Sequence, residues 1–220
     1  ERNLMSLVLY YGSGSPWAWR VQLALEHKAV PYEGKVPSFS AGETRKPEFV
    51  ALNPRHRVPT IDHDGFVLYE SNAIVEYLDE AFPATGAPLF PGDARTRALV
   101  RRLIAEVDNY FDHALDPLTT QAFGKKPEER DGKAIAEARQ GVIDEVGMFT
   151  KAMRGEFLAG PLSAADFALY PLVAFIKRSE IKLPDLNADA MLTPELQAWK
   201  GRIERLPYID KTIPPHWKAS

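Results

Sequence analysis

The sequence predicts a two-domain protein, with an α/β domain over residues 1–83, a linker over 84–93 and an all-α helical bundle over 94–220. Short apolar segments with the composition of strands occur only before the linker. The linker contains proline and glycine without a helical period, which is typical of a domain connection. After it, apolar residues recur at the 3.6-residue spacing of amphipathic helices.

The first domain is expected to run β-α-β and then β-β-α. SLVLYY is a short apolar segment followed by glycine, as in a buried strand. Pro16 suits the first turn of a helix, where its missing N–H needs no partner. Asp64-Gly65 is typical of a hairpin turn. The expected elements are strands over 6–11, within 30–37, and over 60–62 and 66–69, with a helix over 16–27, a helical turn over 47–51 and a helix opened by Ser71.

The second domain is expected to contain four helices. The apolar residues of 95–118 fall on one helical stripe. The segment LSAAD contains a capping box, with Ser163 at the N-cap and Asp166 three residues later, so a helix should begin there. The predicted helices cover 95–118, 133–154, 163–178 and 194–206.

Composition excludes several kinds of site. The 220 residues carry a formal net charge of −3, so we expect no nucleic acid partner. No apolar run approaches the ~18–20 residues of a membrane span, so we expect no membrane and a cytoplasmic location. Without cysteine there is no disulfide, thiolate–metal site or cysteine nucleophile. The five histidines show no metal-ligand spacing, so no metal is expected.

Ser15-Pro16 lies where a strand end meets a helix start, and two interpretations remain open. As N-cap and first helical residue, the pair is explained by structure alone. A helix N-terminus also carries partial positive charge and free N–H groups that stabilise an anion, including a thiolate. A serine hydroxyl there accepts a hydrogen bond from the helix and still donates one to that anion.

Two further segments allow a structural and a functional interpretation. In RVPTI, Pro59 either starts an edge strand or is a cis proline, which would leave the N–H and C=O of Val58 free to pair with an extended peptide. In YESNAIVEYL, Glu70 and Ser71 either cap a helix or bind the ammonium and carboxylate of an amino acid. With Ser15, these segments describe a receptor for a short peptide that carries a thiol.

The order of SPWAWRVQLAL, NPRHRVPTI, YESNAIVEYL, a proline-rich linker and GPLSAADFALYPLV resembles the cytosolic glutathione transferases over nearly the whole chain. Ser-Pro followed by aromatic-x-x-Arg-Val is most similar to the serine-type classes, such as tau and zeta, in a bacterial-style chain. The resemblance implies a thioredoxin-like N-terminal domain, a helical C-terminal domain and a homodimer.

The resemblance also implies the roles of the residues described above. Ser15 would activate the sulfur of glutathione, and Val58 would pair with the cysteinyl backbone beside a cis Pro59. Glu70 and Ser71 would hold the γ-glutamyl end.

At the glycyl end, Arg57 matches a position near the carboxylate of glutathione. The chain departs from the family pattern at His56, where glycine or lysine is commoner, so His56 would replace or assist Arg57. Ser13 is a spare hydroxyl near Ser15. Tyr10 or Tyr11 would compete with Ser15 if the chain were of the tyrosine type.

The resemblance also implies residues at the second-substrate pocket. Tyr110, Phe111 and His113 lie on the helix that lines this pocket in the family, although such residues are usually core or surface. Trp17 would overhang the pocket, and Trp217 belongs to a tail that would close it. The basic residues near the start of that helix are expected to be solvated or to face a dimer partner.

The function implied is conjugation of the glutathione thiolate to small apolar electrophiles, with glutathione as co-substrate and no metal. A glutathione-dependent isomerase of the maleylacetoacetate or maleylpyruvate type is an alternative, since it uses the same thiolate. A non-catalytic glutathione-binding protein is another, because a fold alone does not establish a reaction.

Overall fold

The computed structural model describes residues 6–218, and its contacts divide them into two units. The first unit contains the described residues up to Phe90 together with those from Asp210 onward, and the second contains Pro91–Ile209. The expected domain boundaries therefore need one correction. Residues 210–218, expected in the helical domain, make their contacts with the first unit.

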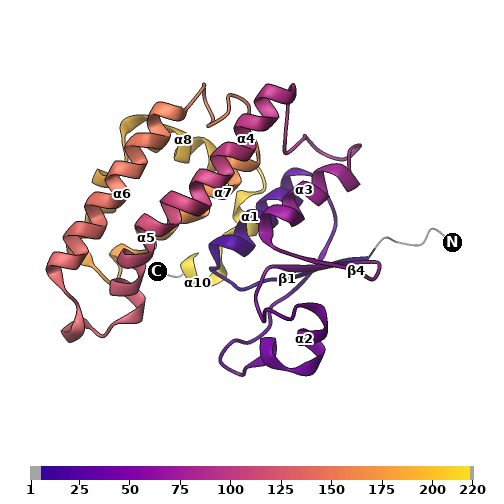
Figure 1. Ribbon diagram of the computed structural model, residues 1–220, viewed down its shortest axis with the longest axis horizontal. Coiled ribbons are helices and arrows are strands. Elements are labelled where there is room, and N and C mark those ends of the chain that lie inside the picture. The colour runs from indigo at the N-terminus through magenta and orange to yellow at the C-terminus, as the bar shows by residue number, and fades with distance from the viewer. Residues whose placement is uncertain (1–5, 219–220) are drawn as a thin grey trace. The chain divides into compact units, whose positions relative to one another are not determined.

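A four-stranded mixed sheet forms the centre of the first unit (Figure 1). The strand order is β2-β1-β3-β4, with β1 parallel to β2 and antiparallel to β3. Leu9 of β1 is fully buried and stands between Gly34 and Ile61 in the register. Asp64 and Gly65 both have positive φ in the β3–β4 turn, as the hairpin prediction required. The strands are β1 (Leu7–Tyr10), β2 (Glu33–Lys35), β3 (Thr60–His63) and β4 (Phe66–Tyr69).

Helices cover both faces of this sheet. Figure 1 shows α1 (Pro16–His27) and α3 (Ser71–Ala81) on one side and α2 (Pro47–Leu52), which follows the short 3-10 helix η1 (Glu43–Arg45), on the other. Ser71 is the first residue of α3, as predicted, and Glu70 rather than Ser71 occupies the N-cap position. The order β-α-β, then β-β-α, confirms the predicted thioredoxin-like class of this unit.

The second unit is helical, as predicted (Figure 1). The helix expected over 95–118 is interrupted by π-helical turns, a feature that an apolar stripe does not reveal. A second π-helical segment follows α5. Within residues 6–218, no helix is both long and apolar enough to cross a membrane. The elements are α4 (Ala94–Glu106), η2 (Val107–Phe111), α5 (Asp112–Thr119), η3 (Thr120–Gly124), η4 (Pro127–Glu129), α6 (Gly132–Ala152), α7 (Ala164–Glu180), η5 (Pro184–Leu186), η6 (Ala188–Met191), α8 (Pro194–Ile203) and, at the boundary with the first unit, α9 (Ile209–Thr212).

Asp166 organises the start of α7 from a fully buried position. Its Oδ1 accepts hydrogen bonds from the backbone N–H of Leu158 at 2.9 Å and from Nε1 of Trp199 at 2.8 Å. Its Oδ2 accepts from the backbone N–H and the hydroxyl of Ser163, which completes the predicted capping box. Burial raises the pKa of Asp166 to about 6, although the four donors act in the opposite direction.

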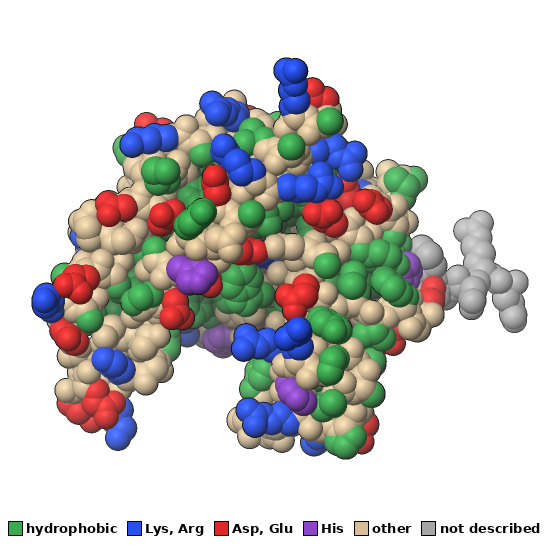
Figure 2. All heavy atoms as spheres, viewed as in Figure 1, with side chains coloured by type: hydrophobic (Ala, Val, Ile, Leu, Met, Phe, Trp, Pro, Cys, Tyr) green, Lys and Arg blue, Asp and Glu red, His purple; other side chains and the backbone are tan. Residues whose placement is uncertain are grey.

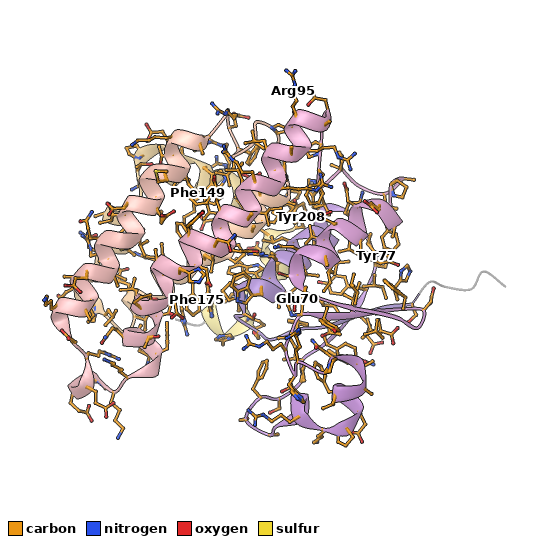
Figure 3. The ribbon with its side chains drawn as sticks, in the orientation of Figure 1. Glu70, Tyr77, Arg95, Phe149, Phe175 and Tyr208 are labelled. Atoms are coloured by element: carbon orange, nitrogen blue, oxygen red, sulfur yellow. The ribbon has the colours of Figure 1, made fainter. Side chains whose placement is uncertain are left out.

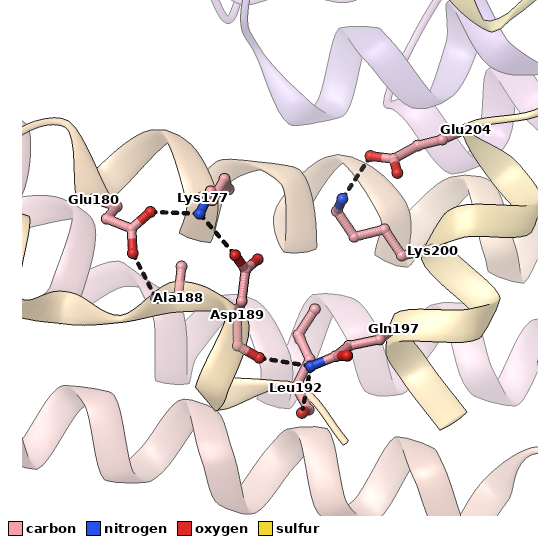
Figure 4. Close-up of polar contacts among 8 residues, drawn as sticks. All are labelled: Lys177, Glu180, Ala188, Asp189, Leu192, Gln197, Lys200 and Glu204. Atoms are coloured by element: carbon pink, nitrogen blue, oxygen red, sulfur yellow. Dashed lines mark hydrogen bonds and ion pairs between the residues drawn. The ribbon is translucent and has the colours of Figure 1, made fainter. Parts of the chain in front are cut away.

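Charged side chains hold the segment after α7 (Figure 4). Lys177 pairs with Glu180 at 2.6 Å and with Asp189 at 2.9 Å, and Glu180 accepts from the backbone N–H of Ala188. Gln197 of α8 donates to the carbonyl of Asp189 at 2.9 Å. These contacts are largely exposed, so they fix the course of η5 and η6 more than they stabilise the fold.

We expect Asp166→Ala to lower the free energy of unfolding by about 3 kcal/mol, because it leaves several buried donors without an acceptor. Urea titration measures this loss, with the exposed Asp185→Ala as control. The raised pKa adds a pH dependence: the folded carboxyl holds its proton up to about pH 6, whereas the unfolded one loses it near ~4. Wild-type stability therefore falls across this window relative to Asp166→Ala. A loss that is equal at pH 5 and pH 7 would contradict the assignment.

Candidate active site

The loop that leads into α1 is a tight turn. The backbone N–H of Ser15 donates to the carbonyl of Gly12 at 3.0 Å, and Gly14 has φ +88°, which favours glycine. The half-buried Ser15 is the N-cap, and its Oγ accepts from the backbone N–H of Ala18 at 3.4 Å. Because this bond uses only an oxygen lone pair, the hydroxyl hydrogen can still be donated to a ligand.

The segment before β3 lies against this loop. The Val58–Pro59 peptide bond is cis, as predicted. A Cβ on Gly12 would lie 3.2 Å from Cγ2 of Val58 and 2.8 Å from Cε2 of Phe39, so glycine allows these side chains to lie close to the loop backbone. The side chain of Asn53 donates to the carbonyl of Arg57 at 2.9 Å and fixes the segment from the other side.

Glu70 and Ser71 form the N-terminus of α3, where Figure 3 places Glu70. Glu70 is exposed and has φ 73°, a conformation that is uncommon for a residue with a side chain. Such backbone costs ~1–3 kcal/mol and is concentrated at ligand sites. Its carbonyl accepts from the backbone N–H of Ile74 at 3.0 Å, which leaves the carboxylate at the open end of the helix.

Arg20, which the sequence analysis did not single out, joins the two helix starts. Its Nη1 donates to Oδ1 of Asn72 at 2.6 Å and to Oγ of Ser71 at 3.5 Å. Its guanidinium lies over the ring of Trp17, 4.6 Å from the centroid, and the side chain is 2% exposed. The available signal was a single arginine within the apolar run WAWRVQLAL, since a buried charge requires partners.

The two residues expected at the glycyl end differ in their surroundings. His56 has φ 57°, and its Nδ1 lies 3.2 Å from the carbonyl oxygen of Thr44. This contact ties the imidazole to the 3-10 helix that precedes α2. Both residues are exposed, so the contact of His56 with Thr44 is the difference between them.

The competing tyrosines point toward other elements. The ring of Tyr10 packs edge-to-face on Phe49 of α2, with ring centroids 5.8 Å apart, and so lies on the sheet face opposite α1. The ring of Tyr11 lies against Gly34, where a Cβ would be 3.0 Å from Cε1. Ser15 is therefore the hydroxyl at the N-terminus of α1.

The residues expected at a second-substrate pocket are divided between the two units. Trp17 and Trp217 belong to the first unit, and Tyr110 and His113 are exposed in the second. Phe111 needs a correction, because its side chain is fully buried in the core of the helical unit beside Phe149. Within residues 6–218, no group of three or more acidic or histidine side chains forms a metal site.

Comparisons with known proteins agree with this geometry. The model of the glutathione S-transferase N-terminal domain matches residues 14–81, and that of the C-terminal domain matches residues 110–207. Glutathione S-transferase A of Pleuronectes platessa is 30% identical to the chain, covering 97% of this chain and 94% of its own. Glutathione S-transferase D7 of Anopheles gambiae is 32% identical, covering 89% and 84%.

A solved structure of a glutathione S-transferase has a similar fold to this chain. The crystal structure of a glutathione S-transferase from the Antarctic clam Laternula elliptica superposes with a TM-score of 0.82 at 32% identity, covering 98% of this chain and 95% of that chain. The family models together match well over half of the chain. The chain therefore belongs to the glutathione S-transferase family and is an enzyme of that family.

Proposed function

We propose that the chain uses Ser15 to activate the thiol of glutathione and transfers the thiolate to small apolar electrophiles. One observation carries the proposal: a single unit brings together the N-terminus of α1, the cis Val58–Pro59 segment and the N-terminus of α3. Gly12 allows the first two to approach closely, and Arg20 joins the two helices.

Glutathione has charged groups that suit these elements. The N-terminus of α3 and the hydroxyl of Ser71 would bind the γ-glutamyl carboxylate, and the carboxylate of Glu70 would bind the ammonium group. The backbone of Val58 would pair with the cysteinyl residue as an added strand does. Arg57 would attract the glycyl carboxylate, with His56 in a supporting role.

This placement brings the cysteinyl sulfur to the start of α1. A free thiol has a pKa near ~8.5, so little of it is ionised at neutral pH. The hydroxyl of Ser15 donates to the thiolate, and the partial positive charge at the helix N-terminus stabilises it further. Lowering the thiol pKa by about 2 units corresponds to roughly 2.7 kcal/mol. The thiol proton is released to solvent, and a sulfur lone pair then forms a bond to the electrophilic carbon. In a substitution the broken bond's electron pair departs with the leaving group, and in an addition the π pair moves to the neighbouring atom, which takes up a proton from water.

The remaining parts of the proposal rest on the family resemblance. Trp17, Trp217, Tyr110 and His113 are proposed to contact the electrophile. The serine-type assignment, with tau and zeta as the most similar classes, and the cytoplasmic location follow the same resemblance.

A homodimer is also proposed, and each unit presents a surface that supports it. Figure 2 shows hydrophobic side chains gathered over β4 and α3, where the half-exposed ring of Phe66 packs against Tyr77, with centroids 5.1 Å apart. In the helical unit, a cavity of about 530 Å³ lies between α4 and α6, where the 62% exposed Met148 is surrounded mainly by charged side chains such as Arg102 and Glu145. Exposed apolar side chains of this kind mark protein interfaces.

Glu70→Gln should weaken glutathione binding about 10- to 100-fold, because it removes the charged partner of the ammonium group while keeping its shape. Calorimetry measures the affinity. The matched control is Glu137→Gln on the exposed face of α6, which should bind as wild type does. Equal affinities of the two variants would overturn the assignment.

Ser15→Ala should raise the pKa of the bound thiol toward about 8.5 and lower the rate at neutral pH, with recovery as the pH rises. The absorbance of the thiolate, titrated against pH in the binary complex, measures this directly. Loss of the cap alone costs ~1 kcal/mol of stability and leaves the thiol pKa unchanged. If Tyr10→Phe shifts the titration and Ser15→Ala does not, a tyrosine performs the activation.

Sedimentation at micromolar concentration should give a species of about twice the 24.6 kDa protomer mass. Phe66→Lys should shift it toward the protomer, since it buries a charge in the proposed interface. Ile181→Lys, at another exposed apolar position, is the control and should remain dimeric. A wild-type chain that sediments only as a protomer would refute the dimer.

The same protein preparation distinguishes the alternative functions. A panel of electrophiles assayed with glutathione should give stable conjugates if the chain is a transferase. Turnover of a cis-configured unsaturated diacid without net loss of glutathione would indicate the isomerase. Tight glutathione binding without turnover of any substrate would indicate a non-catalytic binding protein.

A further inference from the structure

Residues Asp210–Lys218, here called the C-terminal strap, lie beyond both ranges that the family models match. Contacts nevertheless assign the strap to the first unit. Nε1 of Trp19 in α1 donates to the hydroxyl of Thr212 at 2.9 Å, in a buried position. Lys211 pairs with Glu26 near the other end of α1 at 3.4 Å. The strap is therefore anchored along α1, the helix that Ser15 caps.

The end of the strap, α10 (Pro215–Lys218), lies against the loop that carries Ser15. Nδ1 of His216 is 3.2 Å from Oγ of Ser13. The indole of Trp217 packs edge-to-face on Trp19, with ring centroids 5.3 Å apart. A Cβ on Gly14 would lie 3.3 Å from Cε1 and Nε2 of His216 and 3.4 Å from Nε1 of Trp217.

These contacts meet the most flexible part of the candidate site. Residues 12–15 read Gly-Ser-Gly-Ser, and glycine gives the chain the largest conformational freedom to lose. A donor that activates a thiol must be held to within about 0.5 Å of its productive position. The turn bond from Ser15 to Gly12 closes the loop at one point, and the strap supplies a second hydrogen bond through Ser13.

We propose that the strap positions the Gly12–Ser15 loop and that His216 is a positioning residue, which acts on Ser15 through its hydrogen bond to Ser13. The proposal rests on the proposed role of Ser15 in thiol activation. His216 does not touch the sulfur in this arrangement. It restricts the loop so that the Ser15 hydroxyl and the N–H groups of α1 face the same point.

The test compares His216→Ala, which removes the hydrogen bond, with His216→Asn, whose amide keeps a polar atom near the Nδ1 position. His216→Ala should lower kcat about fivefold at neutral pH and raise the pKa of the bound thiol, with a smaller change in KM. His216→Asn should recover most of both. Lys211→Ala is the matched control, because it loosens the strap near Glu26 and leaves the loop contacts in place.

A double-mutant cycle with Ser13→Ala tests the route of the effect. If His216 acts through Ser13, the double variant should be no slower than the slower single variant. Independent, additive losses, or equal losses in His216→Ala and Lys211→Ala, would overturn the proposal.

Hydrogen–deuterium exchange of the ligand-free protein separates this inference from the proposed function. Backbone amides within residues 12–18 should exchange faster in His216→Ala than in Lys211→Ala. This readout requires neither glutathione binding nor turnover. Unchanged exchange in His216→Ala refutes the strap. Unaltered thiol titration in Ser15→Ala refutes the function and leaves the exchange result standing.

Discussion

The buried guanidinium of Arg20 joins the two helices whose N-termini form the candidate site. A cation with 2% exposure is tolerated only where hydrogen bonds and ring contacts compensate for lost water. Here the start of α3 supplies Ser71 and Asn72, and α1 supplies the ring of Trp17. Any shift of α3 along α1 would separate these groups. The same bonds that satisfy the charge therefore fix the distance between the N-termini of α1 and α3, the positions proposed for the sulfur and the amino acid end of glutathione.

Two residues of the candidate site have positive φ, as do Ala29 and the turn residue Asp64 elsewhere in the same unit. Glu70 adopts φ 73° and His56 φ 57°, where a glycine would be less strained. A helix start does not need a positive φ, because Ser15 and Asp93 cap their helices with extended backbone. The unusual backbone at Glu70 is therefore better explained by the direction it gives the carboxylate than by the folding of α3.

Local sequence patterns were sufficient to predict the strands, the β3–β4 hairpin and the capping box at Ser163, whereas the cis bond before Pro59 was predicted from the family motif RVPTI. Each depends on neighbouring residues or on a motif with a fixed order. What the sequence did not reveal depends on partners far along the chain. The burial of Phe111 against Phe149, the role of Arg20, and the return of residues 210–218 to the first unit are long-range contacts. The hydrophobic periodicity of a segment and the secondary-structure propensity of its residues carry little information about such contacts.

This difference between local and long-range information explains why the proposed activating residue is easier to predict than the structure proposed to position it. A serine before a proline at a helix start follows from local rules, and the electrostatics of the helix N-terminus come with it. Holding that serine in a glycine-containing loop is a different requirement, because the loop's own sequence favours many conformations. In the proposed arrangement His216 meets it from about two hundred residues away, by its hydrogen bond to Ser13, while Thr212 anchors the strap through its bond from Trp19. Local patterns thus predict the proposed activating group, and distant packing is proposed to hold it in place.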